Sequence, residues 1–169
     1  DQEWIYDPTP DFTYGFNIYL EYKNFDFTAF FQGVQGVDII SDLKKETDIW
    51  AGLNIGFLNK GRRLLDAWSA TNPNSNIPAV SLSDNNNEKR VSSYWVENGS
   101  YLKLRTVQIG YNVPKSFAQK LAMERLRFYL SAQNLFTVKS SSFTGVDPEN
   151  PNYGYPIPLN ITFGLNVTF

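Results

Sequence analysis

The last eleven residues of the chain alternate between apolar and polar side chains without a slip. Strict alternation with a period of two predicts a β-strand with one apolar face. The polar side is small and uncharged, which suits a transmembrane β-strand of about 9–11 residues, apolar outward and polar inward. A half-buried strand of a soluble sandwich has the same pattern, so the rest of the chain must decide between the two. The two alternating sets are Leu159, Ile161, Phe163, Leu165, Val167 and Phe169, and Asn160, Thr162, Gly164, Asn166 and Thr168.

The same alternation recurs in four earlier stretches, each rich in aromatic residues. We therefore predict an all-β, antiparallel segment of a transmembrane β-barrel with five strands. Their expected bounds are about 12–22, 25–35, 100–112, 124–138 and 159–169.

The strand at 100–112 keeps one apolar face only if its phase slips by one residue. Leu102 and Leu104 precede the slip, and Val107 follows it. Without a slip, Arg105 would share the face of Val107, and an arginine facing lipid at mid-bilayer costs about 2–4 kcal/mol. We therefore predict a β-bulge near Arg105 and Thr106. The alternative, that Lys103 and Arg105 already lie above the bilayer, stays open.

The connections between the expected strands alternate between short and long. Short turns fall at Lys23 and Asn24 and at 114–123, whereas long loops run over about 36–99 and 139–158, the first with a short helix expected at 60–70. Outer-membrane barrels have short periplasmic turns and long outer loops, so the two long segments are expected to be extracellular. This orientation predicts a periplasmic aromatic girdle of Tyr22, Phe25, Tyr111 and Phe169.

Composition excludes several classes of protein. The chain has no Cys and no His, so it has no thiolate metal site and lacks the commonest general base. A net charge of -2 with no basic stripe argues against nucleic acid as a partner. No apolar run is long enough for a transmembrane helix, and the first residues do not form a signal peptide. We expect no enzyme, no cofactor and no metal site.

Five strands are too few to close a membrane barrel, because the smallest has eight. We therefore expect the chain to be the last part of a larger barrel. The alternative is a soluble β-sandwich that binds carbohydrate through its long loop. Such a sandwich requires polar outward faces and a second sheet packed on the first.

Side chains in the long loop offer a few candidate contacts. Trp50, Trp68 and Trp95 could stack on sugar rings or on a partner, although packing within the loop is the plainer interpretation. A pair of carboxylates for glycoside hydrolysis would have to come from Asp26, Asp38 and Glu97, and nothing brings two of them together. Glycines within the strands are expected to mark kinks or crowded approaches. They are Gly15, Gly33, Gly110 and Gly164.

Several motifs resemble those of SusC/RagA-type TonB-dependent transporters, in the same order and over nearly the whole chain. Residues 90–105 read RVSSYWVENGSYLKLR and residues 108–114 read QIGYNVP. The other matching stretches are PDFTYGF at 10–16, FFQGVQG at 30–36, LSAQNLFT at 130–137, GVDPE at 145–149 and TFGLNVTF at 162–169.

The resemblance implies the C-terminal piece of a 22-stranded barrel in the outer membrane of a Gram-negative, Bacteroidetes-type bacterium. Such transporters import oligosaccharides or peptides, are powered through TonB, and usually pair with a SusD-like surface lipoprotein. Their plug domain and TonB box precede this part. Expected partners are therefore the rest of the transporter, the lipoprotein, TonB through the preceding part, and lipid or lipopolysaccharide. The terminal Phe169 also resembles the signal read by the barrel-assembly machinery.

Overall fold

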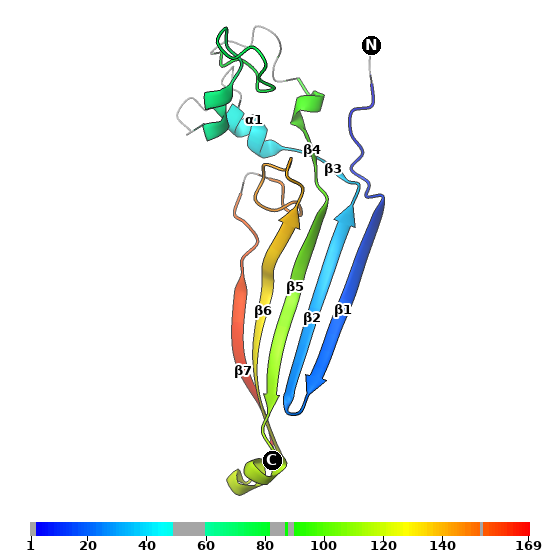
Figure 1. The fold of residues 1–169 in the computed structure, drawn as a ribbon, viewed down its shortest axis with the longest axis vertical. Helices are drawn as coiled ribbons and strands as arrows, with labels where there is room; N and C mark the ends of the chain where they lie inside the picture. Colours follow the sequence, from blue (N-terminus) through cyan, green and yellow to red (C-terminus); the bar gives the residue numbers. More distant parts are fainter. Residues whose placement is uncertain (1–2, 49–59, 82–86, 88–89, 153) are drawn as a thin grey trace.

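The computed structural model describes residues 3–48, 60–81, 87, 90–152 and 154–169. Its main element is a twisted sheet of five long antiparallel strands, and neighbouring strands in the sheet follow the order β1-β2-β5-β6-β7 (Figure 1). These strands are β1 (Phe12–Tyr22), β2 (Phe25–Gln35), β5 (Tyr101–Asn112), β6 (Arg125–Lys139) and β7 (Asn160–Thr168). The bounds of β1 and β2 coincide with the prediction, β5 differs by one residue at its start, and β6 and β7 differ by one residue at each end.

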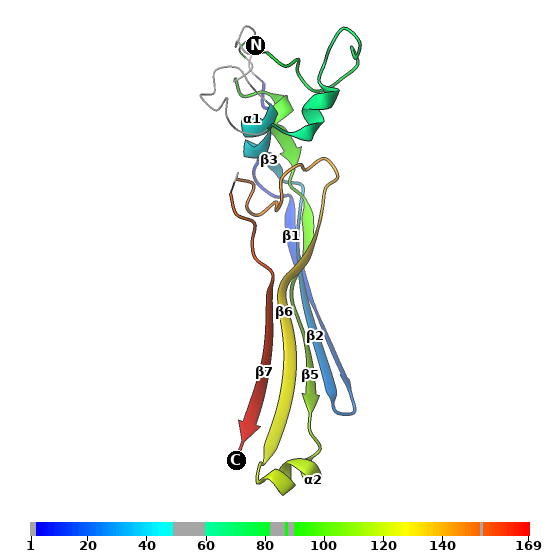
Figure 2. The same ribbon diagram turned by 90° about the vertical axis from the view of Figure 1, so that its left-hand side faces the viewer.

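The connections gather at opposite ends of the sheet (Figure 2). The long-loop end carries a two-stranded sheet and short helices, and the short-turn end carries the β1–β2 turn and one helical turn. The long-loop elements are β3 (Asp38–Ile40), α1 (Asp42–Asp48), η1 (Arg62–Asp66), η2 (Ser93–Trp95) and β4 (Val96–Asn98). The helical turn consists of α2 (Lys115–Ala118) and η3 (Gln119–Leu121).

Two sequence predictions for the first long loop are wrong. The helix expected at 60–70 is a 3-10 helix of five residues, Arg62–Asp66, and none of its residues is buried. Instead, α1 and the β3–β4 pair form in stretches expected to be irregular. Among the described residues, no helix combines the length and apolar character needed to cross a membrane.

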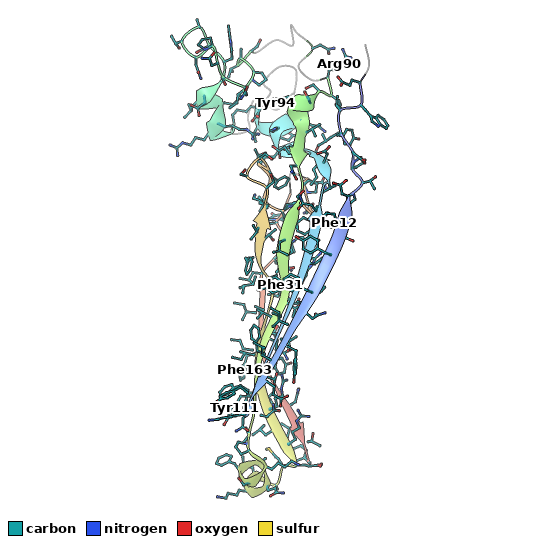
Figure 3. The ribbon with its side chains drawn as sticks, turned by 45° about the vertical axis from the view of Figure 1, so that its right-hand side comes forward. Phe12, Phe31, Arg90, Tyr94, Tyr111 and Phe163 are labelled. Atoms are coloured by element: carbon teal, nitrogen blue, oxygen red, sulfur yellow. The ribbon has the colours of Figure 1, made fainter. Side chains whose placement is uncertain are left out.

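The register of the sheet separates an apolar face from a polar face. The apolar face has no charged residue on any of the five strands, whereas every charged strand residue lies on the polar face. The apolar face consists of Phe12, Tyr14, Phe16, Ile18, Leu20, Tyr22, Phe25, Phe27, Ala29, Phe31, Gly33, Gln35, Leu102, Leu104, Val107, Ile109, Tyr111, Leu126, Phe128, Leu130, Ala132, Phe136, Val138, Ile161, Phe163, Leu165 and Val167. Figure 3 shows Phe31, Tyr111 and Phe163 of this set along the sheet.

The predicted β-bulge is confirmed, and it lies at Arg105. The register places Thr106 opposite Phe30 and Leu104 opposite Phe31, so Arg105 has no partner on β2. A bulge inserts one residue and shifts the alternation by one. Leu104 therefore stays on the apolar face with Val107, while Arg105 donates a hydrogen bond to Gln32 on the polar face.

A second irregularity lies on β6, beside the bulge at Arg105. Asn134 and Leu135 on β6 lie opposite the single residue Arg105, between the pairs Leu104–Phe136 and Thr106–Gln133. Asn134 has a φ of 55°, which asparagine tolerates better than most residues. Ala132 and Phe136 are four residues apart, so β6 keeps its alternation across the irregularity and both residues lie on the apolar face.

Aromatic rings cover two strand glycines, as expected for crowded approaches. Gly33 is paired with Tyr14, and a Cβ atom at Gly33 would lie 2.1 Å from the Tyr14 ring. Gly164 is paired with Tyr129, and a Cβ atom there would lie 2.4 Å from that ring. A ring placed over glycine fills the missing side-chain volume and helps to fix the register of the pair.

We expect Gly33→Ala to lower the free energy of unfolding by about 1–3 kcal/mol, because the new methyl group displaces the Tyr14 ring. The measurement is the unfolding midpoint in denaturant. The control is Gly154→Ala, where a Cβ atom would meet nothing within 4 Å. Equal midpoints for the two variants would contradict the covering role of Tyr14.

Candidate functional site

A buried charge cluster joins the polar face of the sheet to the second long loop. The Lys103 side chain is 0 % exposed, and its Nζ lies 2.7 Å from an oxygen of Asp147 and 2.6 Å from one of Glu149. Glu149 also forms an ion pair with Arg105 and accepts a 2.6 Å hydrogen bond from the Tyr101 hydroxyl. The two acids of the GVDPE motif therefore neutralise the two cations that border the bulge on β5.

The pKa of Glu149 lies below its ordinary value of 4.5. Burial pushes this pKa upward, but hydrogen bonds from Lys103 and Tyr101, with the charges of Lys103 and Arg105, lower it by more. Glu149 therefore stays ionised beside Lys103. This outcome matters because a buried cation without a partner is strongly destabilising.

A second cluster ties the two long loops to each other. Glu97 on β4 is buried, and its carboxylate lies 3.1 Å from Lys44 Nζ on α1. The same carboxylate accepts hydrogen bonds from the backbone N–H and the hydroxyl of Thr144, at 3.0 and 2.7 Å. Three segments that are far apart in the sequence thus meet at one carboxylate.

Residues 38–48, 62–66 and 93–98 form a cap at the long-loop end of the sheet (Figure 1), and Asp48 at the end of α1 joins its parts. It accepts hydrogen bonds from the Tyr94 hydroxyl at 2.5 Å and from Arg63 Nε at 2.7 Å. Burial, followed by the hydrogen bond to Asp48, raises the pKa of Tyr94 above its ordinary range. Tyr94 therefore remains a neutral donor at physiological pH.

The tryptophans expected to contact a ligand differ in their positions. Trp95 is 2 % exposed, packs with Ile40 and Tyr94, and donates its indole N–H to the Arg90 carbonyl. Trp95 is therefore buried at the long-loop end, and stacking of its ring on a sugar or on a partner would require the ring to become exposed. Trp68 is 48 % exposed on the outer part of the long loop, and Trp50 lies outside the described residues.

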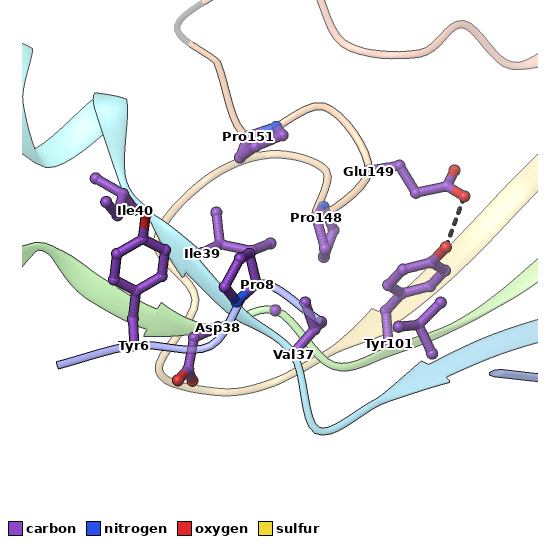
Figure 4. Close-up of a pocket in the computed structure, with 12 residues that line it drawn as sticks. Tyr6, Pro8, Val37, Asp38, Ile39, Ile40, Tyr101, Pro148, Glu149 and Pro151 are labelled. Atoms are coloured by element: carbon purple, nitrogen blue, oxygen red, sulfur yellow. Dashed lines mark hydrogen bonds between the residues drawn. The ribbon is translucent and has the colours of Figure 1, made fainter. Parts of the chain in front are cut away.

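A cleft of about 420 Å³ lies where the N-terminal segment meets both long loops (Figure 4). Apolar side chains of Tyr6, Val37, Ile39, Ile40 and Pro151 form most of its wall. Its two carboxylates already have partners within the chain. Asp38 accepts the Asp7 backbone N–H, and Glu149 belongs to the Lys103 cluster.

The carboxylates considered for hydrolysis are not brought together as an acid pair. Asp26 on β2 pairs with Arg127 on β6, with Nε at 3.0 Å from a carboxylate oxygen. This ion pair passes over Gly110 on the intervening strand, where a Cβ atom would lie 2.3 Å from an Arg127 nitrogen. Glu97 and Asp38 have the separate partners described above, so each carboxylate has a structural role.

Three of the four expected girdle residues follow one line across neighbouring strands. Tyr22 is paired with Phe25, and Phe25 with Tyr111, the last two rings lying 4.8 Å apart. The line continues through Phe128 to Leu165. Phe169 follows the end of β7, at the same short-turn end of the sheet (Figure 1).

The motif residues were visible in the sequence, but their pairing was not. Lys103 and Arg105 are the cations of an otherwise apolar strand, and Asp147 and Glu149 are acids of a proline-rich loop. That imbalance is a signal that charges in the strand need partners from a loop. The sequence contains no information on which loop supplies them.

An apolar face without charges, backed by a face that holds every strand charge, is the arrangement of a membrane β-barrel wall. Known proteins agree with this class. The chain is 38 % identical to TonB-dependent receptor P3 of Formosa agariphila over 100 % of its length and 17 % of the receptor. It is 28 % identical to the receptor SusC of Bacteroides thetaiotaomicron over 96 % of its length and 15 % of that protein.

Among solved structures, the RagAB peptide transporter superposes with a TM-score of 0.79 at 29 % identity, over 97 % of this chain and 18 % of that one. No family model matches the chain. The chain belongs to the SusC/RagA-type family of TonB-dependent receptors. It spans less than a fifth of the length of each of these relatives.

Because the pKa of Glu149 is lowered on folding, its contribution to stability is present above pH 4.5 and is lost as the pH falls through the lowered value. We expect the free energy of unfolding to decrease less steeply with falling pH in Glu149→Gln than in the parent. The measurement is denaturant unfolding between pH 7 and about pH 3. Parallel curves for the two proteins would contradict this role of Glu149.

We expect Glu97→Gln to loosen the contact between the two long loops, because the neutral amide weakens the bonds to Lys44 and Thr144. The loss should be about 1–3 kcal/mol. The measurement is the rate of limited proteolysis within 139–152. The control is Glu46→Gln on α1, because the structure shows no hydrogen bond or ion pair between the Glu46 side chain and another described residue. Equal cleavage rates for the two variants would contradict the role of Glu97 in joining the two long loops.

Proposed function

We propose that this chain forms part of the wall and the outer loops of a TonB-dependent importer in the outer membrane of a Bacteroidetes-type bacterium. In this role the apolar face meets lipid and the polar face lines the lumen. The single observation that carries the proposal is the absence of charge from the apolar face of all five strands. A charged side chain facing lipid would be costly.

The proposal also accounts for the edges of the sheet. β1 and β7 each pair with one neighbour among the described strands, so each has an unpaired edge. In lipid, unpaired backbone groups cost several kcal/mol each. We propose that further strands of the same receptor pair with both edges and close a barrel of about 22 strands, with this chain as its C-terminal five.

The orientation follows from the connections. We propose that the long-loop end is extracellular and that the short-turn end, with Tyr22, Phe25, Tyr111 and Phe169, is periplasmic. A SusD-like lipoprotein would then meet the cap and Trp68. The TonB contact would come from the preceding part of the receptor, and recognition of the Phe169 end by the barrel-assembly machinery is a further proposal.

The cargo is an oligosaccharide or an oligopeptide. RagAB is described as a peptide transporter, and this description supports the peptide option without deciding for this chain. The relatives are named as receptors and transporters rather than enzymes, which supports a role without catalysis.

The alternative of a soluble carbohydrate-binding sandwich requires a second sheet over the apolar face. The other sheet within the described residues is the two-stranded β3–β4 pair, which lies at the long-loop end (Figure 1). Phe163, in the middle of β7, is 68 % exposed. This arrangement favours lipid as the missing partner of the face.

We expect Leu130→Arg to block assembly of the complete receptor, because Leu130 lies between Ile109 and Phe163 on the apolar face. An arginine there should cost about 2–4 kcal/mol. The measurement is the amount of folded, heat-modifiable receptor in outer membranes.

The matched control is Ser131→Arg, one residue along β6 on the polar face. We expect the control to assemble at close to the parent level. Normal assembly of Leu130→Arg, or equal loss in both variants, would overturn the proposed lipid contact.

A further inference from the structure

The helical turn between β5 and β6 protrudes beyond the strand ends at the short-turn end (Figure 2). It consists of α2 and η3, and it is the one connection at this end with helical residues within the described chain. Its sequence from 115 to 121 reads KSFAQKL. The turn carries two cationic residues, Lys115 and Lys120, and three apolar residues, Phe117, Ala118 and Leu121.

The turn is held rigidly against the sheet. The Phe117 and Ala118 backbone N–H groups donate to the Pro114 carbonyl, and Met123 donates to the Ala118 carbonyl. Ala118 is buried, and the hydrogen bond from Val113 to Leu126 closes the strands below it. These bonds define the backbone of the turn between β5 and β6.

The turn exposes two large apolar residues. Phe117 is 56 % exposed and Leu121 is 49 % exposed. Phe117 lies in α2 and Leu121 at the end of η3, so each of the two short helices exposes one large apolar side chain. Lys115 and Lys120 are exposed on the same turn, and neither has an ion pair with a described residue.

The apolar face of the sheet continues toward this turn. Tyr111 is on the strand that leads into it, and Phe128 is on the strand that leaves it. These two residues and Phe163 line a shallow hollow of about 190 Å³ on the apolar face.

We propose that the turn 115–121 is an interfacial anchor for anionic phospholipid, with Phe117 and Leu121 inserted among the chains and Lys115 and Lys120 against the phosphates. This inference rests on the proposed function, which places the apolar face in lipid. Each lysine near an anionic surface contributes attraction, and an apolar residue pair flanked by lysines is the pattern of interfacial helices. The partner is therefore the phospholipid leaflet on the periplasmic side.

The test uses the complete receptor in vesicles of phosphatidylethanolamine and phosphatidylglycerol, with any other cysteines replaced by serine. Nitroxide labels are attached to Phe117→Cys, to Ser116→Cys and to Leu130→Cys, one at a time. Power-saturation EPR then measures access of oxygen, which partitions into lipid, and of a nickel chelate, which stays in water. Ser116 is the matched control on a different side of the same turn.

We expect the label at 117 to be several-fold less accessible to nickel than the label at 116. The label at 130 reports on the proposed function by itself. Lipid contact at 130 with water contact at 117 would overturn the anchor and leave the importer proposal standing. Water contact at 130 would overturn the importer proposal.

The charge component has its own test. We expect the double variant Lys115→Gln/Lys120→Gln to increase nickel access at 117 several-fold in the phosphatidylglycerol vesicles. In vesicles with phosphatidylcholine in place of phosphatidylglycerol, the double variant and the parent should be equal. The control is Lys45→Gln at the long-loop end, which should change neither value. A response independent of phosphatidylglycerol would overturn the role of the lysines.

Discussion

The separation of charge onto one face of the sheet depends on the bulge at Arg105. Lys103 and Arg105 are two residues apart and are the two charged residues of β5. Because the bulge changes the phase of the strand, both cations lie on the polar face while Leu104 and Val107 share the other. Without the bulge, Lys103 and Arg105 would share the face of Val107, and Leu104 would lie on the opposite face.

The bulge creates a need for counter-charge, and the second long loop supplies it. Asp147 and Glu149 hold Lys103, while Glu97 holds Thr144 of the same loop to Lys44 of α1. Buried ion pairs contribute more to specificity than to stability when alternative partners exist. In this chain the ion pairs of Lys103 and Glu97 favour one arrangement of the two long loops at the end of the sheet.

Sequence reasoning succeeded where periodicity carries the information and failed where long-range contacts do. The five strands, the bulge at Arg105 and the crowded glycines follow from alternation and from the cost of charge on an apolar face. The helix expected at 60–70 is shorter than predicted: none of the residues of Arg62–Asp66 is buried, and helices in proteins are stabilised mainly by packing of an apolar face. The burial of Trp95 and the loop charge clusters depend on segments about 50 to 100 residues apart, which local pattern cannot relate.

The ion pair that crosses Gly110 has a consequence for how the strands come to lie in the correct order. Asp26 and Arg127 can meet only over a position that lacks a side chain, and Gly110 is that position. If β5 slid by two residues, Gln108 or Asn112 would stand opposite Asp26 and block the contact. The ion pair therefore favours the alignment in which Asp26 lies opposite Gly110, and in that alignment it joins β2, β5 and β6.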